Sequence, residues 1–395
     1  MGSKMSKNKT PLFFLIAGEA SGDYLGARLM QALKIEAGRK VRFVGVGGPR
    51  MQAEGIDLLF PQSDLAHMGL FELFFHLPKI VCRIYQTITF VKKLKPAAVI
   101  TIDSPDFCFR VAKKLKGLDI PLIHYVAPTV WAWRPKRAKK IAAFLDHLLV
   151  LLPFEPPYFT KEGLACTFVG HPLVESGASH GDSAAFRRRV KAPKEARFMA
   201  LLLGSRRGEV NRLLPIFRSV VCRLAKRYPD LHLVVPTVPA VADTVEKELK
   251  KWSIPVHITS NDKEKYDAFA ACDVALACSG TVSVELAMAA VPTIIAYKVS
   301  SFTAMLYRRF IKAKYATLLN IMKDREVMPE YLQEDCIPEK LVEAVERLLD
   351  DESARQVQKD ELEEIGTWLG RGQFIPSEKA ASTVFKIVRG EKVEA

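Results

Sequence analysis

The chain has 395 residues, of which 49% are hydrophobic and 26% charged, and its formal net charge is +14. This length is typical of two domains, and the composition is that of a water-soluble globular protein. No uncharged apolar run is long enough to cross a bilayer, which excludes an integral membrane protein. The excess of positive charge indicates an anionic partner, such as nucleic acid, a phosphorylated substrate or an acidic membrane surface.

The first half of the chain alternates apolar runs with segments of helix length. Runs that are apolar almost throughout are typical of parallel strands whose sheet is covered by helices on both faces. The expected strands lie at 12–17, 41–48, 97–103, 121–126 and 147–153.

The same pattern then starts again after a polar stretch, "ESGASHGDSAAF", at 175–186. The second set of expected strands lies at 197–205, 231–237, 254–260, 273–280 and 291–297. The sequence therefore predicts an α/β protein with two Rossmann-like domains that face a cleft, followed by helices. We expect an N-terminal domain over 1–174, a second domain over 175–365, and a C-terminal helix over 366–395 that packs back toward the N-terminal domain.

Acidic residues follow the first and third expected strands. "GEASGD" places Glu19 after the first strand, and "IDSPDF" places Asp103 and Asp106 after the third. Because the carboxyl ends of parallel strands share one edge of a sheet, we expect these acids to lie in one ligand site.

The start of the first expected helix offers a second kind of contact. The backbone N–H groups of Ser21, Gly22 and Asp23 could hold an anion or a sugar hydroxyl. Ser21 and Asp23 could equally serve only to cap the helix.

Two strand-to-helix junctions in the second half are suited to a nucleotide. In "LLLGSRRGEV", Gly204, Ser205 and Arg206 form a junction at which helix N–H groups and a guanidinium could hold a diphosphate. In "ACSGTVSVELA", residues 279–281 (Ser279, Gly280 and Thr281) precede Glu285, whose carboxylate could accept hydrogen bonds from both hydroxyls of a ribose.

Missing motifs narrow the class of enzyme. The chain lacks G-x-G-x-x-G and the P-loop pattern, so nicotinamide dehydrogenases and P-loop hydrolases lose support. Its one G-x-S-x-G match, "GASHG" at 177–181, lies in the polar stretch and not between an apolar strand and a helix, so α/β-hydrolases lose support as well. It also lacks a D-x-D pair, and its cysteines form no C-x-x-C pair. We therefore expect neither a metal ion nor a cofactor.

The order of motifs along nearly the whole chain resembles the lipid-A-disaccharide synthases, which are inverting glycosyltransferases with the two-domain GT-B fold. The motifs that carry the resemblance are "AGEASGD" (17–23), "VGVGGPRMQAEG" (44–55), "IDSPDF" (102–107), "HYVAPTVWAWRPKR" (124–137), "LPFE" (152–155), "GSR" (204–206) and "SGT" (279–281). The resemblance implies transfer of 2,3-diacylglucosamine from its UDP donor to the 6-hydroxyl of 2,3-diacylglucosamine 1-phosphate, which yields a β-1,6-linked disaccharide phosphate and UDP.

The resemblance also implies roles for particular residues. Glu19, Ser21 and Asp103 would lie on the acceptor side, and Arg206 would lie beside the donor phosphates. The residues expected around UDP are Ser279, Gly280, Thr281, Glu285 and Asn320.

We expect a single displacement in which Asp103 takes the proton of the acceptor hydroxyl, while Arg206 meets the charge of the departing UDP. Glu19 is an alternative base, and His124, at the end of an expected strand, is a third candidate.

Both substrates carry acyl chains, so the resemblance implies a cytoplasmic enzyme bound peripherally to the anionic inner face of the inner membrane, with a homodimer left open. The apolar segment 65–85 predicts either a helix at the membrane interface or an ordinary core helix.

Alternative functions are a UDP-sugar epimerase or a peptidoglycan transferase on the same fold. A basic nucleic-acid-binding module is a third alternative, but the chain carries no recognised nucleic-acid motif, so we expect no nucleic-acid partner.

Overall fold

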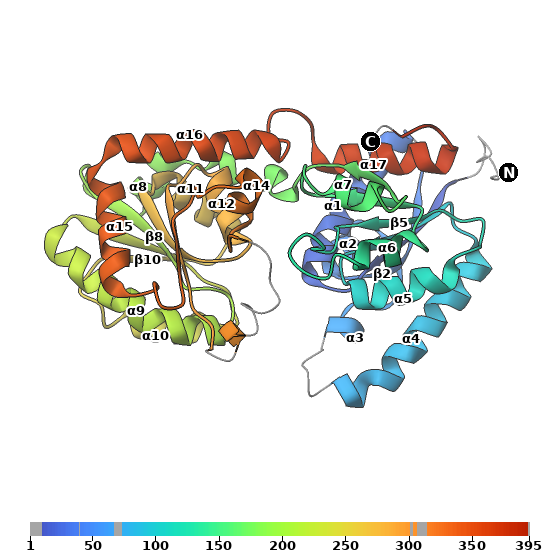
Figure 1. The fold of residues 1–395 in the computed structure, drawn as a ribbon, viewed down its shortest axis with the longest axis horizontal. Coiled ribbons are helices and arrows are strands. Elements are labelled where there is room, and N and C mark those ends of the chain that lie inside the picture. Colours follow the sequence, from blue (N-terminus) through green and yellow to red (C-terminus); the bar gives the residue numbers. More distant parts are fainter. Residues whose placement is uncertain (1–9, 39, 67–72, 301–302, 306–313, 394–395) are drawn as a thin grey trace. The chain divides into compact units, whose positions relative to one another are not determined.

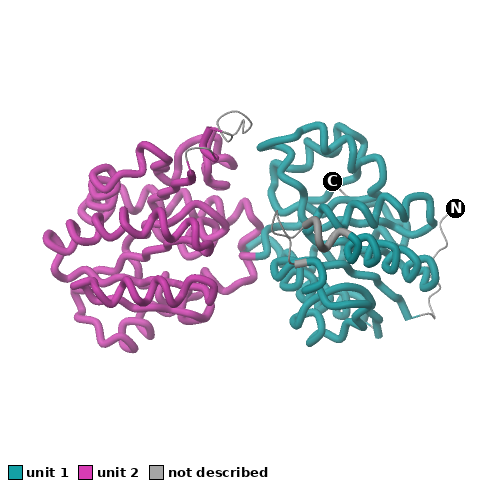
Figure 2. Tube along the Cα trace, turned by 90° about the horizontal axis from the view of Figure 1, so that it is seen from below, with its two compact units in different colours: residues 1–172, 372–395 teal, residues 173–371 magenta. Residues whose placement is uncertain are grey.

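The computed structural model describes residues 10–38, 40–66, 73–300, 303–305 and 314–393. The chain divides into two compact units (Figure 2). The first comprises Met1–Pro172 together with Gly372–Ala395, and the second comprises Leu173–Arg371. The boundaries expected from the sequence, after residues 174 and 365, differ from these divisions by two and six residues.

The first unit is built on a seven-stranded sheet of order β3-β2-β1-β4-β5-β6-β7, in which every pair of neighbouring strands is parallel. Its strands are β1 (Leu12–Ala17), β2 (Arg42–Gly47), β3 (Ile56–Pro61), β4 (Ala98–Ile102), β5 (Leu122–Tyr125), β6 (His147–Val150) and β7 (Ala165–Phe168). Its helices are α1 (Ala20–Ala37), α2 (Pro49–Ala53), α3 (Ser63–Ala66), α4 (Leu73–Leu94), α5 (Pro105–Leu115), α6 (Arg137–Ala142), α7 (Pro156–Thr160) and α17 (Pro376–Arg389).

Both faces of this first sheet are buried, which explains why its strands are apolar without alternation. Phe13 belongs to the cluster under α1 and α17, and its neighbour Phe14 belongs to the cluster under α4 and α5. The C-terminal helix α17 lies along α1 (Figure 1), with the rings of Phe13 and Phe385 at a centroid distance of 5.5 Å. The last segment of the chain is therefore part of the first unit.

The second unit is built on a six-stranded parallel sheet of order β10-β9-β8-β11-β12-β13. Its strands are β8 (Arg197–Leu202), β9 (Leu231–Pro236), β10 (Val256–Thr259), β11 (Val274–Cys278), β12 (Thr293–Tyr297) and β13 (Glu330–Leu332). Its helices include α8 (Ser183–Arg189), α9 (Arg207–Arg227), α10 (Ala242–Leu249), α11 (Asp262–Ala271), α12 (Val282–Met288), α14 (Leu318–Lys323), α15 (Pro338–Asp350) and α16 (Glu352–Trp368). The prediction of two Rossmann-like units with helices at the C-terminus is confirmed.

The apolar segment 65–85 lies partly outside the described residues, because 67–72 and the side chains of 73–77 are not among them. In its described part, Leu65, Ile80 and Ile84 are buried in the core of the first unit. Val81 and Tyr85, on the other side of α4, are exposed. The described end of α4 is thus an amphipathic helix packed on the sheet. Among the described residues, no helix combines the length and apolarity that a bilayer crossing needs.

Candidate active site

The edge of the first sheet at the carboxyl ends of β1 and β4 brings two predicted site residues into contact. The hydroxyl of Ser21, in the first turn of α1, donates a hydrogen bond to Oδ2 of Asp103 at 3.0 Å. The two residues meet because β1 and β4 are parallel neighbours, so the loops that follow them leave the sheet side by side. Oδ1 of Asp103 has no hydrogen bond to any described residue and is free to accept one from a ligand.

Glu19 lies at the N-cap of α1 on the same edge. Partial burial raises the pKa of its carboxyl, and the negative charge of Asp103 raises it further. When two carboxylates lie close together, the negative charge of one raises the pKa of the other, so one of them holds its proton to a higher pH. Glu19 therefore retains its proton to a higher pH than an isolated glutamate.

The loop after β4 has an unusual backbone. Asp103 and Ser104 both adopt the left-handed region, with φ of 52° and 41°. This conformation is strained for residues other than glycine, and such strain is concentrated at functional sites. Gly18 accommodates this loop, since a Cβ at residue 18 would lie 2.5 Å from Oγ of Ser104.

Two residues expected to bind substrate at the start of α1, Gly22 and Asp23, also have structural roles. Asp23 is buried, and its Oδ1 accepts hydrogen bonds from the backbone N–H groups of Gly48 and Met51, both at 2.9 Å. Its Oδ2 accepts another from the N–H of Arg50 at 3.0 Å. Asp23 thus fixes the start of α2. Gly22 lets α1 pack closely on the sheet, because a Cβ there would lie 3.2 Å from the carbonyl oxygen of Ile102.

The side chain of His124, the third residue of β5, is fully buried. Its Nδ1 lies 2.7 Å from Oγ1 of Thr101, and its ring packs edge-on against Phe109. Burial lowers the pKa of His124 to about 3, and the charge of Arg137 acts in the same direction. This imidazole is neutral at physiological pH and belongs to the core, which removes it from the candidate bases.

In the second unit, the junction between β8 and α9 differs from the expected phosphate cradle. The carboxylate of Glu209 accepts hydrogen bonds from the N–H groups of Ser205 and Arg206, both at 3.2 Å. Its other oxygen lies 2.9 Å from a guanidinium nitrogen of Arg206. Glu209 therefore occupies the donors that were expected to hold a diphosphate, as a capping box does. The Arg206 side chain is 81% exposed, so its remaining N–H groups are available to a ligand.

The junction between β11 and α12 is open where the sequence predicts nucleotide contacts. A Cβ added at Gly280 would meet no atom within 4 Å, so the backbone there is accessible. The hydroxyl of Ser279 donates a long hydrogen bond, 3.5 Å, to the carbonyl of Ala316, and Thr281 is the N-cap of α12. Glu285 lies 3.0 Å from Nζ of Lys265, and burial raises the pKa of its carboxyl while Lys265 opposes that rise. Sequence reasoning missed Lys265.

Asn320 is fully buried, and the structure gives it a structural role rather than a nucleotide contact. Its amide donates to the carbonyl of Met328 at 2.7 Å and to Glu330 at 2.8 Å. Its oxygen accepts from the N–H groups of Val327 and Met328. With every donor and acceptor used, Asn320 stabilises the loop between α14 and β13.

One buried carboxyl in the first unit was not recognised from the sequence. Glu155, the last residue of "LPFE", accepts hydrogen bonds from the N–H of Leu152 at 3.1 Å and from Nε1 of Trp131 at 3.4 Å. Burial raises its pKa to about 7, although both hydrogen bonds oppose the rise. Glu155 thereby ties the loop after β5 to the loop after β6. The acid at the end of "LPFE", two residues after the expected strand 147–153, was the signal that could have revealed this residue.

The two parallel α/β units, with acids after β1 and β4 and an exposed arginine after β8, have the architecture of the GT-B fold class. The chain resembles the solved structure of Staphylococcus aureus MnaA with UDP, with a TM-score of 0.65, 13% identity, and 98% of each chain covered. At this identity the likeness shows the fold alone.

Sequence comparisons identify the family. The family model for lipid-A-disaccharide synthetase matches residues 13–384. The lipid-A-disaccharide synthase of Rhodospirillum centenum is 55% identical over 96% of this chain and 95% of its own length. That of Paramagnetospirillum magneticum is 49% identical over 96% and 98%. The chain belongs to the lipid-A-disaccharide synthase family, and it is a glycosyltransferase of lipid A biosynthesis.

Proposed function

We propose that the chain transfers 2,3-diacylglucosamine from its UDP donor to the 6-hydroxyl of 2,3-diacylglucosamine 1-phosphate, with inversion at the anomeric carbon. The observation that carries this mechanism is the contact between Ser21 and Asp103 beside Glu19, at the edge of the sheet where ligands of such folds bind. Membership of the family supplies the substrate class.

Asp103 acts as the general base. The hydrogen bond from Ser21 holds Oδ2, which orients the carboxylate and leaves Oδ1 to accept the proton of the attacking hydroxyl. Glu19 is the alternative base, because it lies on the same edge of the sheet and its raised pKa makes its ionised carboxylate a stronger proton acceptor than an ordinary glutamate. Its place on the same edge suits it to bind a sugar hydroxyl.

The second unit binds the UDP moiety. Arg206, exposed and held at one side by Glu209, meets the charge that develops on the departing diphosphate. Glu285 accepts hydrogen bonds from the ribose hydroxyls, and the open backbone at Gly280 admits the nucleotide.

The enzyme works at the inner face of the inner membrane, where both acylated substrates reside. The net charge of +14 favours attachment to anionic headgroups, and the basic residues that follow β5 supply part of that charge.

The test is to incubate purified protein with both sugars and to identify the products by mass spectrometry. Formation of a disaccharide phosphate together with UDP, dependent on the acceptor, supports the proposal. Conversion of the donor to an epimer without acceptor, or release of UDP without a disaccharide, would contradict it.

A further inference from the structure

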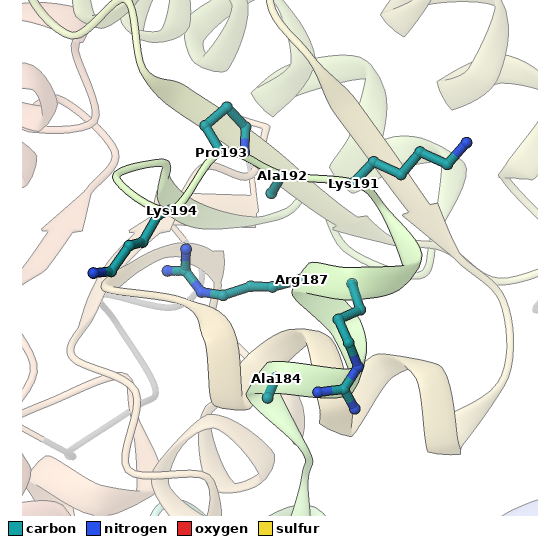
Figure 3. Close-up of a pocket in the computed structure, with 7 residues that line it drawn as sticks. Ala184, Arg187, Lys191, Ala192, Pro193 and Lys194 are labelled. Atoms are coloured by element: carbon teal, nitrogen blue, oxygen red, sulfur yellow. The ribbon is translucent and has the colours of Figure 1, made fainter.

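A surface cavity of about 360 Å³ lies in the second unit, at the C-terminal end of α8 (Figure 3). Its volume falls within the range of small-molecule pockets. The lining residues are Ala184, Arg187, Arg188, Lys191, Ala192, Pro193 and Lys194. Four of these residues are cationic and none is acidic, so the cavity is suited to an anion.

This cavity is separate from the candidate active site. Lys194 lies three residues before Arg197, the first residue of β8, whereas Arg206 lies four residues after Leu202, the last residue of the same strand. The six residues of β8 span roughly 20 Å at about 3.3 Å per residue. An anion in the cavity would therefore lie at the amino end of the strands, while UDP would bind at the carboxyl end.

Arg187 is held in place on the wall of the cavity. One guanidinium nitrogen donates to the carbonyl of Ala196 at 2.9 Å, and the guanidinium carbon lies 4.8 Å from the centre of the Phe198 ring. In the view of Figure 3, the side chains of Arg187 and Lys194 extend to the same side. A guanidinium fixed in this way loses little conformational entropy when it binds an anion through its other N–H groups.

The remaining cations of the cavity have no acidic partner. Arg188, Lys191 and Lys194 are exposed and form no ion pair with any residue that the structure describes, whereas Arg189, which points elsewhere, lies 3.9 Å from Asp267. Cations at the end of α8 complement the helix dipole, but Lys191 and Lys194 lie beyond its last turn. Like charges that line one cavity repel one another, and a bound anion would offset part of that repulsion.

We propose that the cavity formed by Arg187, Arg188, Lys191 and Lys194 binds a phosphate-bearing anion, at a site distinct from those of the donor and the acceptor. The planar guanidinium of Arg187 matches two phosphate oxygens, and the lysines add point charges. The site stands on its own residues and is independent of the transferase reaction.

Thermal unfolding tests the site directly. The variant Lys191→Gln/Lys194→Gln removes two exposed cations from the cavity, and Lys247→Gln/Lys250→Gln removes two exposed cations from the region of α10 as a matched control. Inorganic phosphate, compared with chloride at equal ionic strength, should raise the Tm of the wild type and of the control. The apparent phosphate affinity of the cavity variant should be about tenfold weaker. Equal phosphate responses in all three proteins would overturn the proposal.

His232 provides a second readout. Burial lowers its pKa, and the charge of Arg187 lowers it further. An anion bound to Arg187 would offset that charge, so phosphate should raise the pKa of His232 measured by NMR titration of its ring protons. In the cavity variant the rise should be much smaller at the same phosphate concentration. A His232 pKa that does not respond to phosphate in the wild type would contradict binding at Arg187.

Vesicles then distinguish the two sources of phosphate. Flotation of the cavity variant and of the control is measured with vesicles of phosphatidylcholine alone and with vesicles that also contain phosphatidylglycerol. If the cavity variant floats less than the control on the acidic vesicles, the ligand is a lipid headgroup. If both float equally while the phosphate response is lost only in the cavity variant, the ligand is a soluble phosphate-bearing molecule.

Discussion

Ser21 and Asp103 are 82 positions apart in the chain, yet the hydroxyl of one lies 3.0 Å from the carboxylate of the other. The contact joins the first turn of α1 to the loop after β4, and it fixes one oxygen of the proposed base. The two residues belong to one site because their strands are neighbours, not because their motifs are adjacent in sequence.

Asp103→Ala should lower kcat by ~100- to 10,000-fold, because the acceptor hydroxyl loses the group that takes its proton. UDP affinity, measured by calorimetry, should stay within a few-fold of the wild type. Asp119→Ala is the matched control, since Asp119 is an exposed carboxylate in the loop between α5 and β5, before the amino end of β5. Turnover within a few-fold of the wild type in Asp103→Ala would transfer the role of base to Glu19.

Arg206→Ala should weaken UDP binding by about tenfold or more, since a hydrogen bond to a charged group contributes about 1.5–3 kcal/mol. Arg207→Ala, an exposed arginine one position further along, controls for the loss of positive charge. Calorimetric titration with UDP measures both variants. If they bind UDP equally well, Arg206 does not contact the nucleotide.

Gly18→Ala should displace the loop after β4 and lower activity, because the new Cβ would lie 2.5 Å from Oγ of Ser104. Ser104→Gly removes that side chain and suits the positive φ of residue 104, so it should be neutral or stabilising. The double variant should recover most of the activity lost in Gly18→Ala. An additive loss in this double-mutant cycle would mean that the two residues do not interact.

Glu155 should make the protein less stable as pH rises. Its pKa in the folded protein is about 7, above the ordinary value of 4.5, so its contribution is fully present below pH 4.5 and is lost as pH rises through 7. The shift corresponds to roughly 3 kcal/mol. Glu155→Gln should flatten the dependence of unfolding free energy on pH between 4.5 and 7, as measured by urea denaturation. An unchanged slope would assign the pH dependence to other groups.

Activity should persist in a chelator. The sequence has no D-x-D pair, and among the residues that the structure describes no three histidine, cysteine or acidic side chains gather as metal ligands. Assays with and without EDTA, after dialysis, measure this directly. A strict requirement for magnesium or manganese would show that a metal ion, rather than Arg206, meets the charge of the diphosphate.

The parallel sheets could be predicted because their strands are apolar on both faces, as Phe13 and Phe14 illustrate. Three edge strands, β3, β7 and β13, are absent from the expected strands, and the three residues of β13 form a strand only through their pairing with β12. The meeting of Ser21 with Asp103 follows from the rule that ligands bind at the carboxyl edge of such sheets.

For several site residues, burial and hydrogen-bond partners could not be predicted because they depend on segments that are distant in the sequence. The burial of His124 and Asn320 is set by elements that pack around them. Asp23 is engaged by a loop that begins 25 residues later. The contacts of Glu209 with the junction after β8 could have been predicted locally. A carboxylate three residues after an N-cap is the pattern of a capping box.

The return of α17 to the first unit has a consequence for biosynthesis. Phe385 is buried against Phe13, so the face of the first sheet under α1 is complete only when the last helix has been made. On the ribosome, the second unit, which is continuous in sequence, can finish folding while the first still lacks α17. The nascent first unit must therefore keep part of its apolar face uncovered until α17 has been made, and it is most prone to aggregate during that interval.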